Sequence, residues 1–111
     1  MPLRPIELHV LLALIAGPLH GYALVRRIDE DSEGRVGLLP GNLYAVIRRL
    51  EAEGLVGESP RKPAPDEDQR RRYYQLTAKG RRMLAREARH LENLLERLRS
   101  RLEPALGNTK R

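Results

Sequence analysis

The sequence predicts a mainly α-helical chain with a small β-hairpin: a winged helix-turn-helix followed by a long C-terminal dimerisation helix. Three short amphipathic helical patterns, joined by tight turns, occupy about the first 50 residues. Two extended segments with a Pro-rich loop between them come next. The chain then continues as one long helical pattern with leucines at heptad spacing. These observations predict a winged helix-turn-helix domain at residues 1–76 and a dimerisation helix with its tail at residues 77–111.

Composition narrows the class of protein. The 111 residues suffice for one domain, and the absence of Trp and Phe leaves an aliphatic core. The absence of Cys excludes disulfides, Cys-ligated zinc and thiol catalysis, and it is compatible with the cytoplasmic location that we expect. Residues 1–60 hold 6 Arg against 8 Asp and Glu, whereas residues 61–111 hold 15 Lys and Arg against 7 Asp and Glu. The basic second half predicts an anionic partner, either nucleic acid or an acidic membrane surface.

The first helix is predicted at about residues 5–16, where the only long apolar run of the chain lies. One face of it is defined by three- and four-residue spacing: Leu8, Leu11, Leu12 and Ile15. The run is well short of the ~20 residues of a membrane span, so no membrane-spanning helix is expected. Of the two anionic partners we expect nucleic acid and no membrane. Gly17-Pro18 ends this helix, and a second amphipathic helix is predicted at about residues 20–31.

The third helix, within residues 38–56, has a marked start and a marked end. Pro40 suits a first helical turn, and Gly54 suits the left-handed position after the last turn. At 100° per residue the inward arc consists of Leu43, Val46, Ile47 and Leu50. The opposite face and its flanks consist of Gly41, Asn42, Tyr44, Ala45, Arg48, Arg49 and Ala52. Small residues ringed by polar and cationic ones can enter a DNA groove, although an ordinary solvated surface helix is the alternative.

The hairpin is predicted from two extended segments, Leu55–Ser59 and the run RRRYYQL that ends at Leu76. Alternation in the second segment places Tyr74 and Leu76 toward the core, and Arg71, Tyr73 and Gln75 on the other side. A hairpin after the third helix is a wing. The loop at residues 60–69 is alternatively a disordered charged linker.

The last helix is predicted from about Thr77, a plausible N-cap, to about residue 103, where Pro104 and Gly107 end it. Its seam repeats at four and three residues: Leu84, Ala88, Leu91, Leu95, Leu98 and Leu102. A helix of roughly 40 Å is longer than one small domain can cover, so the stripe predicts a partner. In the alternative, the stripe folds back on the protein's own core.

No set of residues predicts catalysis. His9, His20 and His90 lie in three different elements without a metal-ligand or proton-relay pattern, and there is no Gly-rich phosphate loop. Packing or capping roles are expected for the histidines. We therefore expect no enzyme activity, no cofactor and no metal.

Three segments of the sequence resemble the patterns of a known family in their order and spacing. They read LLALIAGPLHGYALVRRI, LLPGNLYAVIRRLEAEGLV and RRRYYQLTAKGRRML. They are similar to the patterns LLxGPxHGY, PGxLYxxLxRLExxGL and RRxYYxLTxxG of the PadR family of winged-helix transcriptional regulators, over residues 11–84. The single helix after the wing resembles the compact subgroup of that family. Leu39 differs from the Ser that many members place before the proline.

The resemblance implies a DNA interface and a dimer interface. In that family the third helix enters the major groove, the wing contacts the adjoining backbone, and the last helix dimerises with help from the partner's first helix. The expected DNA-binding residues on the third helix are Pro40, Gly41, Asn42, Tyr44, Ala45, Arg48 and Arg49, and those on the wing are Arg70, Arg71, Arg72 and Tyr73. The expected dimerisation residues are Leu8, Leu11 and Leu12 together with the seam from Leu84 to Leu102.

The sequence thus predicts a homodimeric, sequence-specific DNA-binding transcriptional regulator, a repressor that binds a pseudo-palindromic operator. The rival interpretation is a winged-helix protein-interaction module that binds a protein through its leucines without DNA. A small-molecule effector is possible and not identified by the sequence. The drug-stacking site that some small members build from tryptophans is not expected, because this chain has no Trp.

Overall fold

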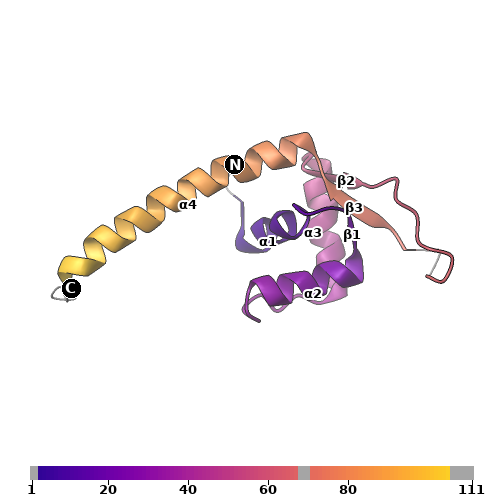
Figure 1. Ribbon diagram of the computed structural model, residues 1–111, viewed down its shortest axis with the longest axis horizontal. Coiled ribbons are helices and arrows are strands. Elements are labelled where there is room, and N and C mark those ends of the chain that lie inside the picture. The colour runs from indigo at the N-terminus through magenta and orange to yellow at the C-terminus, as the bar shows by residue number, and fades with distance from the viewer. Residues whose placement is uncertain (1–2, 68–70, 106–111) are drawn as a thin grey trace.

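A computed structural model describes residues 3–67 and 71–105. In chain order it contains α1 (Pro5–Ala13), β1 (Leu19–His20), α2 (Gly21–Asp31), α3 (Pro40–Ala52), β2 (Val56–Glu58), β3 (Tyr73–Leu76) and α4 (Ala78–Ala105). The first three helices pack beside the sheet, α4 extends away on one side, and the wing loop projects on the other (Figure 1). The principal extents are 59 × 26 × 21 Å. The predicted winged helix-turn-helix with a long C-terminal helix is confirmed.

The sheet is larger than the hairpin that the sequence predicts. Three antiparallel strands lie in the order β1-β3-β2, with Leu19 opposite Tyr74 and Val56 opposite Leu76. The strand β1 has two residues, too few for a period-two pattern to be visible in the sequence. Its pairing makes β3 the central strand and places His20 opposite Tyr73.

The core is aliphatic apart from Tyr74, which alternation also predicts to face it. All four inward residues of α3 are buried: Leu43, Val46, Ile47 and Leu50. They pack in one cluster with buried side chains of α1, α2 and the sheet, among them Leu11, Leu24 and Leu55. Burying such a side chain contributes roughly 1.5–3 kcal/mol. This cluster fixes α3 so that its other face points to solvent.

Helix α1 differs from the prediction in length and in its buried face. It ends at Ala13, and a turn closed by hydrogen bonds such as Leu14 N–H to Leu11 O leads to Gly17, whose φ is +149°. Leu11 is fully buried in the core, which is a correction because the sequence assigned it to dimerisation. Leu12 and Ile15 are instead 42% and 45% exposed. The spacing predicted that apolar residues share one face of α1. Because α1 is apolar nearly all round, its tertiary contacts and not the spacing determine which side is buried.

The two ends of α3 follow the sequence signals closely. Gly54 has φ +77°, and its N–H donates to Glu51 O while the N–H of Leu55 donates to Leu50 O, which satisfies the last carbonyls. At the other end the N-cap is Leu39, whose side chain makes no capping hydrogen bond. A Ser, Thr, Asp or Asn at an N-cap contributes typically ~0.5–2 kcal/mol relative to Ala. The start of α3 lacks that contribution.

Helix α4 begins at the predicted cap and stands away from the core. The hydroxyl of Thr77 accepts the N–H of Gly80 at 3.0 Å and donates to Gly54 O at 2.6 Å. Gly80 lies directly against the carbonyl of Leu55, where a Cβ would overlap that oxygen. Pro104 lies inside the last turn rather than ending the helix at about residue 103, so that boundary is corrected. Gly107 lies outside the described residues.

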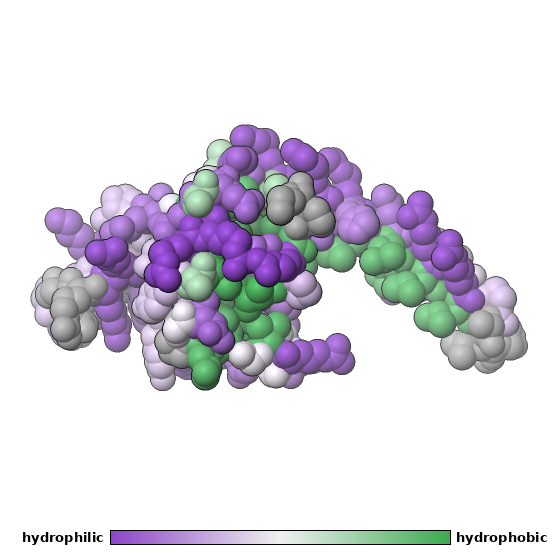
Figure 2. All heavy atoms as spheres, turned by 180° about the vertical axis from the view of Figure 1, so that it is seen from behind, coloured by the Kyte–Doolittle hydropathy of each residue, from purple (hydrophilic) through white to green (hydrophobic). Residues whose placement is uncertain are grey.

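The leucine stripe of α4 is exposed along most of its length. Exposure ranges from 41% to 50% for Leu91, Leu94, Leu95, Leu98 and Leu102. Hydrophobic atoms follow one side of α4 and hydrophilic atoms the other (Figure 2). The alternative in which the stripe folds back on the protein's own core is therefore wrong for this structure. Within the described residues, no helix is long and apolar enough to cross a membrane.

Candidate nucleic-acid interface

The outer face of α3 and the two wing arginines border one hollow of about 550 Å³, which we call the wing hollow. The start of α2, α3 and the strands β2 and β3 form its walls. Its cationic side chains are Arg48 on α3 and Arg71 and Arg72 beside β3. The tertiary structure thus brings together two groups of residues that are more than twenty positions apart in the sequence.

Tyr44 forms part of this hollow because a glycine makes room for it. A Cβ built on Gly21, the first residue of α2, would lie 2.7 Å from Tyr44 Oη. Any side chain at this position would push the ring outward. Tyr44 is 42% exposed, so the phenol rests on the start of α2 while its outer edge remains accessible. The HGY segment of the sequence therefore has a steric role at the candidate interface.

The remaining outward residues of α3 lie where the sequence predicts. Gly41, Asn42, Ala45 and Arg48 are all exposed. Across residues 3–67 and 71–105, no carboxylate forms an ion pair with the Arg48 guanidinium. Pro40 begins the helix, and its side chain lies outside what the structure describes. An unpaired guanidinium between small residues is accessible to a flat base edge.

Arg49 has a different environment from the one predicted. Its Nη1 lies 2.9 Å from Oε2 of Glu7, which is a buried residue of α1, 6% exposed. The other Glu7 oxygen accepts the backbone N–H of Arg4 at 2.9 Å. Arg49 therefore ties α3 to α1 and is not a free cation at the interface. The signal in the sequence was Glu7 itself, a carboxylate inside an apolar run, which requires a partner when buried.

The wing residues divide into exposed arginines and a buried tyrosine. Arg71 and Arg72 are exposed, and Arg71 Nη1 lies 3.3 Å from Glu67 Oε2. Arg70 lies outside the described residues. Tyr73 lies on the side of β3 away from the core cluster, as alternation predicts, but it is only 2% exposed because other side chains cover it there. With its ring buried, Tyr73 offers little accessible surface for the DNA contact expected of it.

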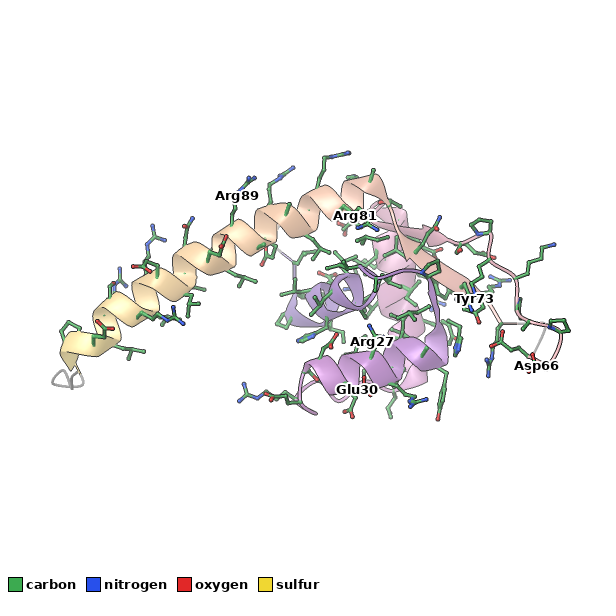
Figure 3. The ribbon with its side chains drawn as sticks, viewed as in Figure 1. Arg27, Glu30, Asp66, Tyr73, Arg81 and Arg89 are labelled. Carbon is green, nitrogen blue, oxygen red and sulfur yellow. The ribbon has the colours of Figure 1, made fainter. Side chains whose placement is uncertain are left out.

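Tyr73 is buried because both faces of β3 are covered at this point. The guanidinium of Arg61 lies 4.3 Å from its ring centroid, and the His20 ring meets it edge-on at 5.3 Å. Its hydroxyl donates to Glu67 at 3.2 Å. Figure 3 places Tyr73 at the base of the wing and Asp66 at the far end of the loop. The loop at residues 60–67 is thereby attached to the sheet, which argues against a free linker over those residues.

The contacts at the base of the wing lower the pKa values of Glu67 and His20. A hydrogen bond from the Ala64 N–H at 2.8 Å lowers the pKa of the Glu67 carboxyl, and the Tyr73 hydroxyl and Arg71 lower it further. Burial lowers the pKa of His20, and Arg71 adds to that shift. Nδ1 of His20 accepts the N–H of Ala23 at 3.3 Å, so the neutral ring caps α2. The prediction of a packing or capping role is confirmed for His20.

A second surface of interest consists of exposed leucines. On α4 it contains the predicted seam, with Leu84 half-buried near the body, Ala88 and the residues beyond exposed, and Leu94 as an addition that the heptad spacing did not include. On α1 it contains Leu12, with Leu8 half-buried. Arg89 points from the opposite side of α4, away from the body (Figure 3).

Comparisons with known proteins give a consistent result. The model of the "Transcriptional regulator PadR-like family" matches residues 10–86. The chain is 34% identical over 89 residues to the transcriptional regulator Rv3488 of Mycobacterium tuberculosis, covering 80% of this chain and 78% of that protein. It is 42% identical over 92 residues to an uncharacterised 37.1 kDa protein of transposon Tn4556 in Streptomyces fradiae, covering 83% of this chain and 24% of that protein.

A structural comparison agrees. The chain resembles the crystal structure of Bacillus subtilis PadR in complex with operator DNA, with a TM-score of 0.65 and 21% identity. The match covers 77% of this chain and 47% of that one. At this level of identity the likeness concerns the fold. The chain thus spans most of the mycobacterial relative and about a quarter of the streptomycete one.

Proposed function

Because the chain belongs to the PadR-like family of transcriptional regulators, we propose that it is a sequence-specific DNA-binding repressor that recognises a pseudo-palindromic operator as a homodimer. The observation that carries this proposal is the wing hollow, where the exposed Arg48 of α3 lies with Arg71 and Arg72 of the wing. The complex of the Bacillus subtilis relative with operator DNA supports the choice of partner. We place the site of action in the cytoplasm.

The roles of the two elements differ because phosphate contacts set affinity while base-edge contacts set sequence choice. Helix α3 carries exposed Asn42 and Arg48, and an Arg that pairs with guanine through two hydrogen bonds gives ~1–3 kcal/mol of discrimination. The wing arginines lie beside β3, outside the helix that is proposed to enter the groove. We therefore assign Arg48 to a guanine, and Arg71 and Arg72 to the phosphate backbone.

Dimerisation forms the other half of the proposal. Residues 1–76 bind DNA, and residues 77–111 contribute the helix that pairs with a second copy. The exposed leucines of α4 provide an apolar stripe that a second stripe can cover. Two α3 helices related by a two-fold axis would contact half-sites about one helical turn, ~10 bp, apart.

The rival proposal, a protein-interaction module that never contacts DNA, gives opposite results in a binding experiment. Purified protein is used to enrich duplexes from a random pool, and the affinity for an enriched duplex is then measured over a range of salt concentrations. Several neutralised phosphates predict a steep linear fall of log K with log salt, about −0.9 per phosphate. A pool that stays random and a weak, salt-independent interaction would contradict the DNA-binding proposal.

The ranking of the α3 residues has its own test on the enriched duplex. Arg48→Ala should relax the choice of one base pair in each half-site, and Asn42→Ala should have a smaller effect. The opposite order would mean that the first turn of α3 reads the bases. A small-molecule effector would be found as a ligand that shifts the affinity for the same duplex.

A further inference from the structure

Leu39 breaks two local rules at the tip of α3. It occupies the N-cap position without making a capping hydrogen bond, where a Ser, Thr, Asp or Asn would make one. It is also 67% exposed, although it is a large apolar side chain. Local rules are broken most often at functional sites, since function maintains a residue that stability does not favour.

The surroundings of Leu39 are apolar on a second helix as well. Tyr22, at the start of α2, is 64% exposed. Both side chains line a second hollow of about 550 Å³, together with Val25 and Leu38 and with the charged Arg26 and Asp29 of α2. The exposed leucine is thus part of a mainly apolar surface formed by α2 and the segment that leads into α3.

This surface continues into the proposed DNA interface. Gly41 and Asn42, both exposed, follow Leu39 within the first turn of α3. Helix-turn-helix proteins place the N-terminal residues of this helix against base edges in the major groove. The apolar group that base edges present there is the C5-methyl of thymine, and apolar side chains read it by contact. The side chain of a leucine has no hydrogen-bonding group for a phosphate or for another base atom.

We propose that Leu39, with Tyr22 beside it, contacts the C5-methyl group of a thymine and makes thymine the preferred base at one position of each half-site. This inference rests on the proposed function, since it requires α3 to lie in the major groove. It assigns to Leu39 a specificity role that hydrogen-bonding residues of α3 cannot supply.

The test replaces thymine by deoxyuridine, one position at a time, in a duplex enriched from the random pool. Deoxyuridine pairs as thymine does and lacks only the methyl group. Wild-type protein should bind about fourfold more weakly when one particular thymine of a half-site is replaced, which is the effect of exposing one buried methyl group. Leu39→Ala should bind the thymine and deoxyuridine duplexes equally at that position.

Two further variants distinguish a contact between Leu39 and the thymine from an effect of Leu39 on the stability of α3. Leu39→Met retains an apolar side chain of similar reach and should retain the preference for thymine. Leu39→Asn supplies the missing N-cap acceptor, so it should raise the melting temperature while losing the preference. This combination would show that the leucine acts on the base and not through folding.

Three results would overturn the inference. Wild-type protein could be insensitive to deoxyuridine at every thymine, or Leu39→Ala could retain the full sensitivity. Either result removes Leu39 from the readout while leaving the proposed function intact. If no duplex is enriched from the pool, the proposed function fails and this inference fails with it.

Discussion

The α4 stripe should determine whether the protein is a dimer, and replacing Leu91 and Leu95 together with Glu tests this. Both side chains lie on the exposed stripe, 41% and 46% exposed. If they pack against a second copy, the variant removes apolar contacts and places two carboxylates from each protomer in the seam. Buried carboxylates without partners are strongly unfavourable.

The structure gives an approximate magnitude for the loss. Fully burying a leucine contributes roughly 1.5–3 kcal/mol, and about half of each side chain remains to be buried. Four leucines in a dimer then contribute roughly 3–6 kcal/mol, which weakens association by about 10²- to 10⁴-fold before the charges are considered. A dimer that is stable at micromolar concentration should therefore become a monomer.

Sedimentation equilibrium at micromolar concentration measures this directly, and an operator titration accompanies it. The variant should be monomeric, with weak binding to one half-site and no tight binding to a two-half-site operator. Asn93→Glu with Ser100→Glu is the matched control, because it adds the same charge to exposed positions on the opposite side of α4. A monomeric wild-type chain would refute the dimer proposal, and a dimeric Leu91→Glu/Leu95→Glu variant would place the interface elsewhere.

Three further variants test the wing and its neighbours. Arg71→Ala should lower affinity for all duplexes and reduce the salt slope by about 1, and an unchanged slope would remove Arg71 from the interface. Gly21→Ala should displace the Tyr44 ring, since the added Cβ would lie 2.7 Å from its hydroxyl oxygen. We expect weaker operator binding in anisotropy titrations, with little loss of the helical circular dichroism signal. An unchanged affinity would contradict this expectation. Burial of His20 in the folded state lowers its pKa, so the unfolded chain binds the proton more readily. The free energy of unfolding, measured in urea titrations, should therefore fall as the pH drops through about 6.5. His20→Asn does not titrate but can still accept the Ala23 N–H, so it should remove that part of the pH dependence.

Sequence periodicity predicted most of the helical framework. The four inward residues of α3 are buried as expected, and Gly54 takes the left-handed conformation that ends this helix. Thr77 caps α4 as predicted. These features depend on neighbours within one or two turns, so the chain itself contains the information. The outward face of α3 followed from the same reasoning, because the side opposite a buried arc is accessible.

Sequence patterns did not predict which tertiary contacts cover the apolar faces of α1 and β3. Leu11 and Leu12 are both apolar, and only the packing of α1 on α2 and α3 made the first a core residue and the second a surface one. Tyr73 alternates toward the outside of its strand, yet Arg61 and His20 cover it there.

The charged residues of the interface were decided in the same way. Arg48 and Arg49 are adjacent on α3, and helical geometry distinguishes them only as the centre and the flank of the outward face. Arg49 reaches buried Glu7, forty-two positions away, whereas Arg48 points into the wing hollow. Periodicity determines which residues share a face, because it depends on local backbone geometry. The partner of each face depends on contacts between distant segments, and only the tertiary structure determines them.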